Sequence, residues 1–134
     1  MYVRREGGSV AILFKPDMVD AILAGRKTVT RRRGAKRWNV GAVHQAKTSL
    51  FGEPFARLRI RGVLHERFPG QTQRDIATLY RNPPGRSLDM EAYREAFSSW
   101  LDFCAAYVAI NGGDPQVLYE PCWRIEFEVV NTDA

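Results

Sequence analysis

The chain has 134 residues, of which 45% are hydrophobic and 26% are charged, and this is the length and composition of one globular domain. Its two cysteines are too few for a disulfide framework or a complete zinc site. The longest uncharged run has eleven residues, about half of what a membrane-spanning helix needs, and no secretory signal pattern opens the chain. We therefore predict one cytoplasmic domain over residues 1–134, with no metal, no cofactor and no membrane contact.

The net charge of +5 comes from one short segment. Residues 26–37 contain seven basic residues and no acidic one, whereas the rest of the chain has 13 basic and 15 acidic residues. A local cationic cluster on a nearly neutral protein is typical of a surface that binds phosphate or another anion. A solvated basic loop has the same composition, so charge alone leaves both interpretations open.

Residues 9–48 predict a strand, a helix and a second strand. The apolar run from Ser9 to Phe14 is typical of a buried strand. Pro16 suits the first turn of a helix over about residues 16–24, and Gly25 is placed to end that helix. The residues from Trp38 to Gly41 predict a turn into a strand over residues 42–48.

The second half of the chain adds two strands and a long helix. A strand is expected over residues 56–64, with Ala56, Leu58, Ile60, Gly62 and Leu64 on one face. A short helix is expected after Thr72, and residues 82–85 predict a loop. An apolar stripe predicts one helix over about residues 89–108. In the last strand, Ile125 and Phe127 should face inward and Arg124 should face water. Strands and helices mixed in this order predict an α+β domain, a small curved sheet or barrel with flanking helices.

The segment from Gly25 to Arg32 has the residues best suited to chemistry. Arginines around Lys27 disfavour its charged form, so its pKa should fall, and a neutral lysine could act as a general base for a threonine hydroxyl. A charged lysine at the same place would instead bind phosphate. The same residues could also do no more than close the preceding helix, where a cation is favourable.

This segment, Gly25-Arg26-Lys27-Thr28-Val29-Thr30-Arg31-Arg32, resembles the signature of the ASCH domain. Phe14, residues 38–43, residues 91–100 and the closing strand at residues 123–127 fit the same pattern. The resemblance implies a PUA-like mixed β-barrel, the fold of many RNA-binding and RNA-modification domains, with the Gly-Arg-Lys-Thr segment lying in a cleft. We expect Trp38 to anchor one end of this barrel, although it could also stack on a base.

Some small ASCH proteins are amidohydrolases that remove the acetyl group from N4-acetylcytidine, and others are reported to act on RNA. By this resemblance, Lys27 matches the basic residue that activates a threonine nucleophile, Thr30 matches the nucleophile, and Arg32 matches the arginine that closes the motif. The amidohydrolase also uses a glutamate between the third strand and the long helix. The corresponding stretch here, residues 80–85, has no acid, and the candidates to replace it are Glu66, Asp75, Asp89 and Glu91.

Three functions follow from these observations. The first is the binding of RNA, a nucleotide or a modified nucleoside in a basic cleft around residues 27–30, where the substrate contacts would be Arg26, Thr28, Arg31, Arg32 and Arg33, with Lys47 extending the surface. The second is hydrolysis, by an amidohydrolase of N4-acylated cytidine or by a ribonuclease, with Lys27 as base and Thr30 as nucleophile. The third is an interaction module whose basic segment meets an acidic protein partner.

Overall fold

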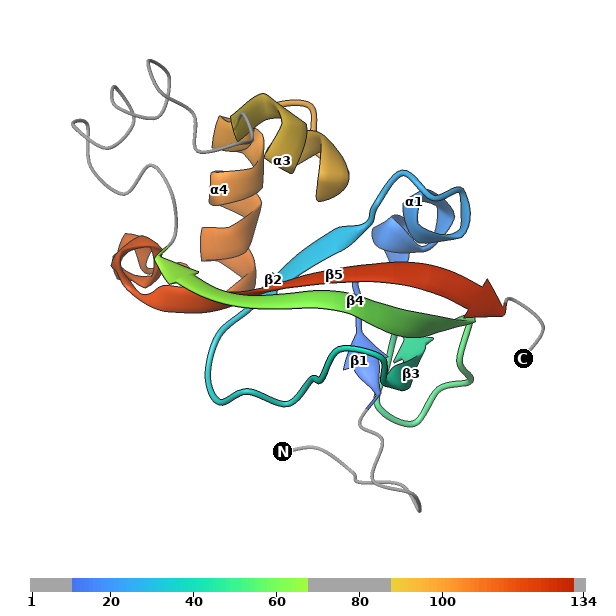
Figure 1. Ribbon diagram of the computed structural model, residues 1–134. Helices are drawn as coiled ribbons and strands as arrows, with labels where there is room; N and C mark the ends of the chain where they lie inside the picture. The colour runs from blue at the N-terminus through green and yellow to red at the C-terminus, as the bar shows by residue number, and fades with distance from the viewer. Residues whose placement is uncertain (1–10, 68–87, 132–134) are drawn as a thin grey trace.

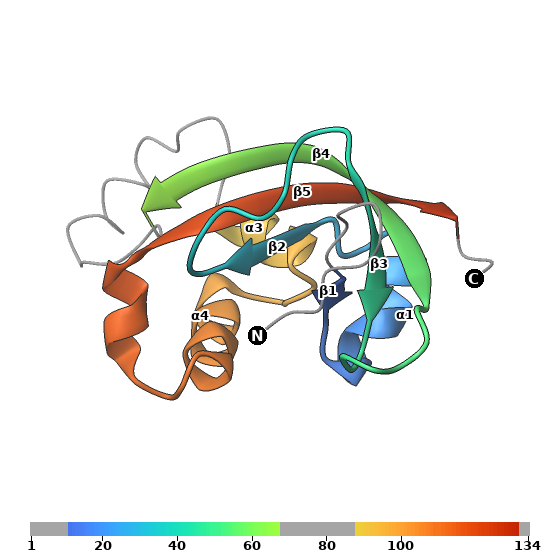
Figure 2. The ribbon, with the colours of Figure 1, turned by 90° about the horizontal axis from the view of Figure 1, so that it is seen from below.

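The computed structural model describes residues 11–67 and 88–131, and the helix and loop expected between residues 72 and 85 lie outside this part. The elements are β1 (Ile12–Leu13), η1 (Pro16–Met18), α1 (Val19–Leu23), β2 (Val29–Arg32), β3 (Val43–Lys47), β4 (Ala56–Arg67), α3 (Leu88–Arg94), α4 (Trp100–Ile110), η2 (Pro115–Tyr119) and β5 (Pro121–Asn131). The strands form one sheet in the order β1-β3-β4-β5-β2, in which only β1 and β3 run parallel. This sheet curls into a half-barrel (Figure 1, Figure 2), which confirms the predicted α+β, PUA-like fold.

The long β4–β5 ribbon contains a bulge that reverses which side chains face the core. Ala56, Leu58 and Ile60 are buried as predicted, but the register against β5 shifts between Ile60 and Gly62. Beyond this shift Val63 packs against the core, and Leu64, predicted to face inward, is 48% exposed. The prediction for Leu64 was wrong because one extra residue in a strand exchanges its two faces.

The single helix expected over residues 89–108 is two helices. The first, α3, ends at Arg94, and Ala96 then adopts a left-handed conformation with φ of 70°. The second, α4, begins after Ser99, whose hydroxyl accepts a hydrogen bond from the Asp102 amide at 3.1 Å. This break places Glu95 in the turn that leaves α3, where its side chain points back to the sheet.

Two apolar clusters lie on opposite faces of β5. One contains Ile125 and Phe127 with residues of α1, β1, β3 and β4, and it also buries Trp38, which confirms the expected anchor. The other joins Cys122 to the apolar residues of α3, α4 and η2, with Cys104 packed against it. Figure 1 accordingly shows α3 and α4 at one end of the β4–β5 ribbon and α1, β1 and β3 toward the other. Among the helices of residues 11–67 and 88–131, none has the length and apolar character needed to span a bilayer.

Candidate active site

The turn after α1 delivers Lys27 into the interior of the domain. Gly25 has a φ of 76°, a conformation that glycine adopts without strain, so it ends the helix as the sequence predicts. The amides of Arg26 and Lys27 both donate to the carbonyl of Ala21, at 2.9 and 3.1 Å. These bonds fix the backbone so that the Arg26 side chain is exposed while that of Lys27 is buried.

Lys27 is bound by Glu95. Its Nζ donates to Glu95 Oε1 at 2.8 Å and to the main-chain oxygen of Glu95 at 3.1 Å. Burial lowers the pKa of Lys27, Glu95 opposes this effect, and Arg32 and Arg31 reinforce it. The predicted direction of the pKa change is therefore confirmed, but its main cause is desolvation, with the neighbouring arginines contributing less.

Arg31 lies in the same network, and its side chain is fully buried. Its guanidinium contacts Glu95 Oε2 at 2.8 Å, Glu91 Oε1 at 2.5 Å and Glu66 Oε1 at 3.3 Å. The group also lies 5.4 Å from the ring of Trp100. Arg31 was predicted to contact phosphate, and in the structure its guanidinium is engaged by three carboxylates.

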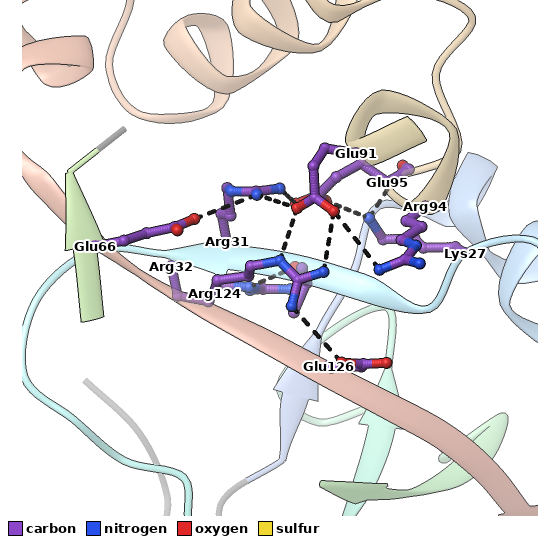
Figure 3. A network of polar contacts seen from close by, with 10 residues as sticks. Lys27, Arg31, Arg32, Glu66, Glu91, Arg94, Glu95, Arg124 and Glu126 are labelled. Carbon is purple, nitrogen blue, oxygen red and sulfur yellow. Dashed lines mark hydrogen bonds and ion pairs between the residues drawn. The ribbon is translucent and has the colours of Figure 1, made fainter. Parts of the chain in front are cut away.

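Glu91 is the centre of this network (Figure 3). Its carboxylate accepts hydrogen bonds from Arg31 and from Arg124. Nε and NH2 of Arg124 donate to the two carboxylate oxygens at 2.7 and 3.0 Å. Burial would raise the pKa of Glu91, but hydrogen bonds from Arg124 and Arg31 lower it to about 2. Arg124, expected in water from strand alternation, is instead buried because α3 covers that face of β5 with Glu91.

On the opposite face of β2, Arg32 joins the two outer strands of the sheet. Its Nε donates to Thr30 Oγ1 at 3.1 Å, its NH2 donates to the Leu13 carbonyl at 2.7 Å, and its guanidinium lies 5.0 Å from the ring of Phe14. Since Leu13 belongs to β1 and Thr30 to β2, Arg32 spans the open side of the half-barrel. Thr30 is 4% exposed, and Arg32 fixes the direction of its hydroxyl.

A cavity of about 340 Å³ brings these residues together. Its polar lining includes Lys27, Thr30, Glu95 and the arginines 31–33, and most of its wall is apolar, from Phe14, Met18, Phe97, Phe103, Ala106, Tyr107 and Ile110. Arg33 also pairs with Glu120 at 2.8 Å, and both side chains are partly exposed.

Three of the predicted contact residues lie away from this cavity. Arg26 is exposed beside α1, and the amide of Thr28 donates to the Arg94 carbonyl at 2.9 Å. The side chain of Lys47 on β3 is 1% exposed, so the prediction that it extends a basic surface was wrong. Within residues 11–67 and 88–131, no group of three or more histidine, cysteine or carboxylate side chains is arranged to hold a metal.

Solved structures with similar folds include proteins of one family, at low sequence identity. The ASCH domain from Lactobacillus crispatus JV V101 is 17% identical with a TM-score of 0.56, and the match covers 89% of this chain and 77% of that one. A point mutant of an ASCH protein from Zymomonas mobilis is 19% identical with a TM-score of 0.51, over 92% of this chain and 75% of that one. The fold is that of an ASCH domain. The hypothetical protein PH0355 is also similar, with 13% identity, a TM-score of 0.58 and coverage of 90% and 97%. Neither the protein-family models nor the curated proteins give a match to the sequence.

Glu95 is the functional candidate that sequence reasoning missed. Of the four acids considered to replace a glutamate near residues 80–85, Glu66 and Glu91 contact Arg31, while Asp75 and the side chain of Asp89 lie outside the described residues. A signal for the break beside Glu95 was present, since Ser99 and Asp102 have the spacing of a helix start with a capping serine. Recognising that start would have ended the preceding helix near Glu95.

Proposed function

We propose that this ASCH domain is an amidohydrolase that removes an acyl group from a modified nucleoside, with N4-acetylcytidine as the reference substrate. The observation that carries the proposal is the buried Lys27–Glu95 pair, which lines the same cavity as Thr30. A hydroxyl nucleophile, a base of lowered pKa and a third group that orients the base are the parts that nucleophilic catalysis requires.

The hydrogen bonds of Lys27 support its role as the base. A lysine ammonium has three hydrogens, and two of them are directed to Glu95, one to Oε1 and one to the main-chain oxygen. The third direction is left for a partner in the cavity, and in the neutral amine it becomes a lone pair. Glu95 thus acts as a positioning residue, while Arg32 donates to Thr30 Oγ1 and leaves the hydroxyl hydrogen for the base.

The proposed reaction gives each of these residues a step. Thr30 Oγ1 attacks the amide carbonyl carbon of the substrate while Lys27 Nζ takes the hydroxyl proton. The tetrahedral intermediate then breaks its C–N bond, and Lys27 returns the proton to the nitrogen of the leaving nucleoside. Water attacks the resulting acyl-threonine ester, with Lys27 again as base, and releases the carboxylic acid. Every proton taken is returned, so no cofactor is required.

The shape and charge of the cavity support a nucleoside as substrate. Its volume falls in the range of about 300–1,000 Å³ that is usual for small-molecule sites, and its aromatic walls suit a planar base. Arg31, the most central cation, is already engaged by carboxylates and is not available for a phosphate chain. RNA binding without hydrolysis is a second candidate, favoured by the exposure of Arg26 and Lys36 in the basic segment.

The test measures the release of cytidine from N4-acetylcytidine across pH 6–10, with chromatography as the readout. Thr30→Ala and Lys27→Ala should each lower kcat by at least about a hundredfold, and Lys27→Arg should fail equally because arginine does not deprotonate. Lys36→Ala is the matched control, since it removes an exposed lysine from the same basic segment and should leave turnover unchanged. Binding of the nucleoside by the wild-type protein with no turnover at any pH would overturn the proposal. Loss of RNA affinity in Arg26→Ala and Lys36→Ala would then support the second candidate.

A further inference from the structure

The charged network around Glu95, whose centre is buried and whose outer members Arg94 and Glu126 are partly exposed, contains unequal numbers of cations and anions. The residues labelled in Figure 3 are five cations, Lys27, Arg31, Arg32, Arg94 and Arg124, and four anions, Glu66, Glu91, Glu95 and Glu126. The other charged groups lining the cavity are Lys15, Asp17 and Arg33, and Arg33 is paired with Glu120. With every group ionised, the nine described residues labelled in Figure 3 carry one excess positive charge.

Lys27 is the group that can remove this excess. Arginine keeps its proton under all ordinary conditions, whereas the pKa of a buried lysine falls readily. The two cations share one carboxylate, since Lys27 occupies Glu95 Oε1 and Arg31 occupies Glu95 Oε2, each at 2.8 Å. When Lys27 releases its proton, Glu95 keeps a charged partner in Arg31, so no buried carboxylate is left alone.

Without Arg31, the charged form of Lys27 would be favoured over the neutral form. Lys27 and Glu95 would then form a neutral ion pair, and deprotonating the lysine would leave an unpaired buried carboxylate, which is costly. We propose that Arg31 is a positioning residue for Lys27: it holds the second oxygen of Glu95 and thereby allows Lys27 to serve as a base. This inference rests on the amidohydrolase function proposed above, and it adds the residue that sets the protonation state of the base.

The surroundings of Arg31 suit this role. Its side chain is fully buried, and its guanidinium lies 5.4 Å from the ring of Trp100 and 5.7 Å from that of Phe103, so water does not screen its charge. Glu91 holds its NH2 group, and Glu91 is held in turn by two bonds from Arg124. This clamp keeps Arg31 against Glu95 while the lysine changes charge.

The experiment measures the pKa of Lys27 by NMR of isotope-labelled lysine, without substrate, in the wild type and in Arg31→Met and Arg31→Gln. Both variants remove the charge, and the two fully buried acids each keep a cation, because Glu91 keeps Arg124 and Glu95 keeps Lys27, while the partly buried Glu66 loses its 3.3 Å contact with Arg31. Methionine fills the apolar space, whereas glutamine preserves hydrogen bonding, so either folded variant carries the test. Arg33→Met is the matched control, since Arg33 pairs with a partly exposed acid.

We expect the pKa of Lys27 to rise in both Arg31 variants and to stay unchanged in Arg33→Met. Turnover at pH 7 should fall at least about tenfold in the Arg31 variants and recover as the pH is raised. The reason is that each unit by which the pKa of Lys27 rises above the working pH lowers the neutral fraction of the lysine about tenfold. An unchanged or lowered pKa in a folded Arg31 variant would overturn the inference. The NMR readout needs no turnover, so a raised pKa together with an inactive wild type would refute the amidohydrolase function while leaving the electrostatic role of Arg31 supported.

Discussion

Replacing Glu91 by glutamine should destabilise the domain strongly, because it removes the anion between two buried arginines. Breaking a buried ion pair in this way costs about 3–5 kcal/mol. The pKa of Glu91 gives a similar magnitude: a fall from 4.5 to about 2 corresponds to about 3 kcal/mol at neutral pH. A domain of 134 residues unfolds with an entropy near 0.28 kcal/mol per kelvin, so the expected loss in Tm is about 11–18 °C.

The pH dependence of this effect has a definite sign. The folded pKa of Glu91 is depressed, so its stabilisation is fully present above the ordinary pKa of 4.5 and is lost as the pH falls toward 2. Thermal unfolding followed by circular dichroism should therefore show a large Tm difference between wild type and Glu91→Gln at pH 7 and a smaller one at pH 3. Glu120→Gln, which disrupts a partly exposed pair with Arg33, is the control and should cost less than about 1 kcal/mol. A Glu91 variant with a Tm within about 3 °C of wild type at pH 7 would refute this reasoning.

Three further predictions concern the helices beside the site. Ala96→Gly should raise the free energy of unfolding by up to about 1 kcal/mol, because Ala96 has a φ of 70°, which glycine adopts more easily than alanine. Ala105→Gly within α4 should instead lower the free energy of unfolding by about 1 kcal/mol. Urea midpoints of the two variants that move in the same direction would contradict this. Ser99→Ala should cost about 1 kcal/mol by removing the cap of α4, and an unchanged urea midpoint would show that the cap contributes nothing. Burial raises the pKa of Cys104 to about 11, so its thiol should react slowly with a disulfide reagent at pH 7 until urea unfolds the chain; rapid reaction in the folded state would refute this.

The sequence was sufficient to predict the features that depend on local chemistry. Gly25 ends α1 and places Lys27 beside β2, as its position after the apolar helix indicates. The alternation of residues 56–60 and of Ile125 and Phe127 identifies the core faces of β4 and β5. These features depend on residue spacing within one element, which the order of residues records directly.

The charge network could not be read from the sequence, because it depends on which elements meet. Strand alternation placed Arg124 in water, but α3 packs on that face and brings Glu91 against it. The sequence places Arg31 in a basic segment. In the fold, its guanidinium donates to Glu91 and Glu95, which lie about sixty residues later in the chain. The break at Ala96 has a weak sequence signal, the capping spacing of Ser99 and Asp102, because the apolar spacing continues through the break and no glycine marks the left-handed residue.

The central claim, that Thr30 is an acyl-accepting nucleophile activated by Lys27, is tested most directly by looking for the acyl-enzyme. The protein is mixed with N4-acetylcytidine, quenched rapidly in acid, digested and analysed by mass spectrometry. The account predicts one added acetyl group on the peptide that contains Thr30, with none in Thr30→Ala or Lys27→Ala. Cytidine release by wild-type protein with no acetylated Thr30 at any quench time, together with full activity of Thr30→Ala, would contradict it.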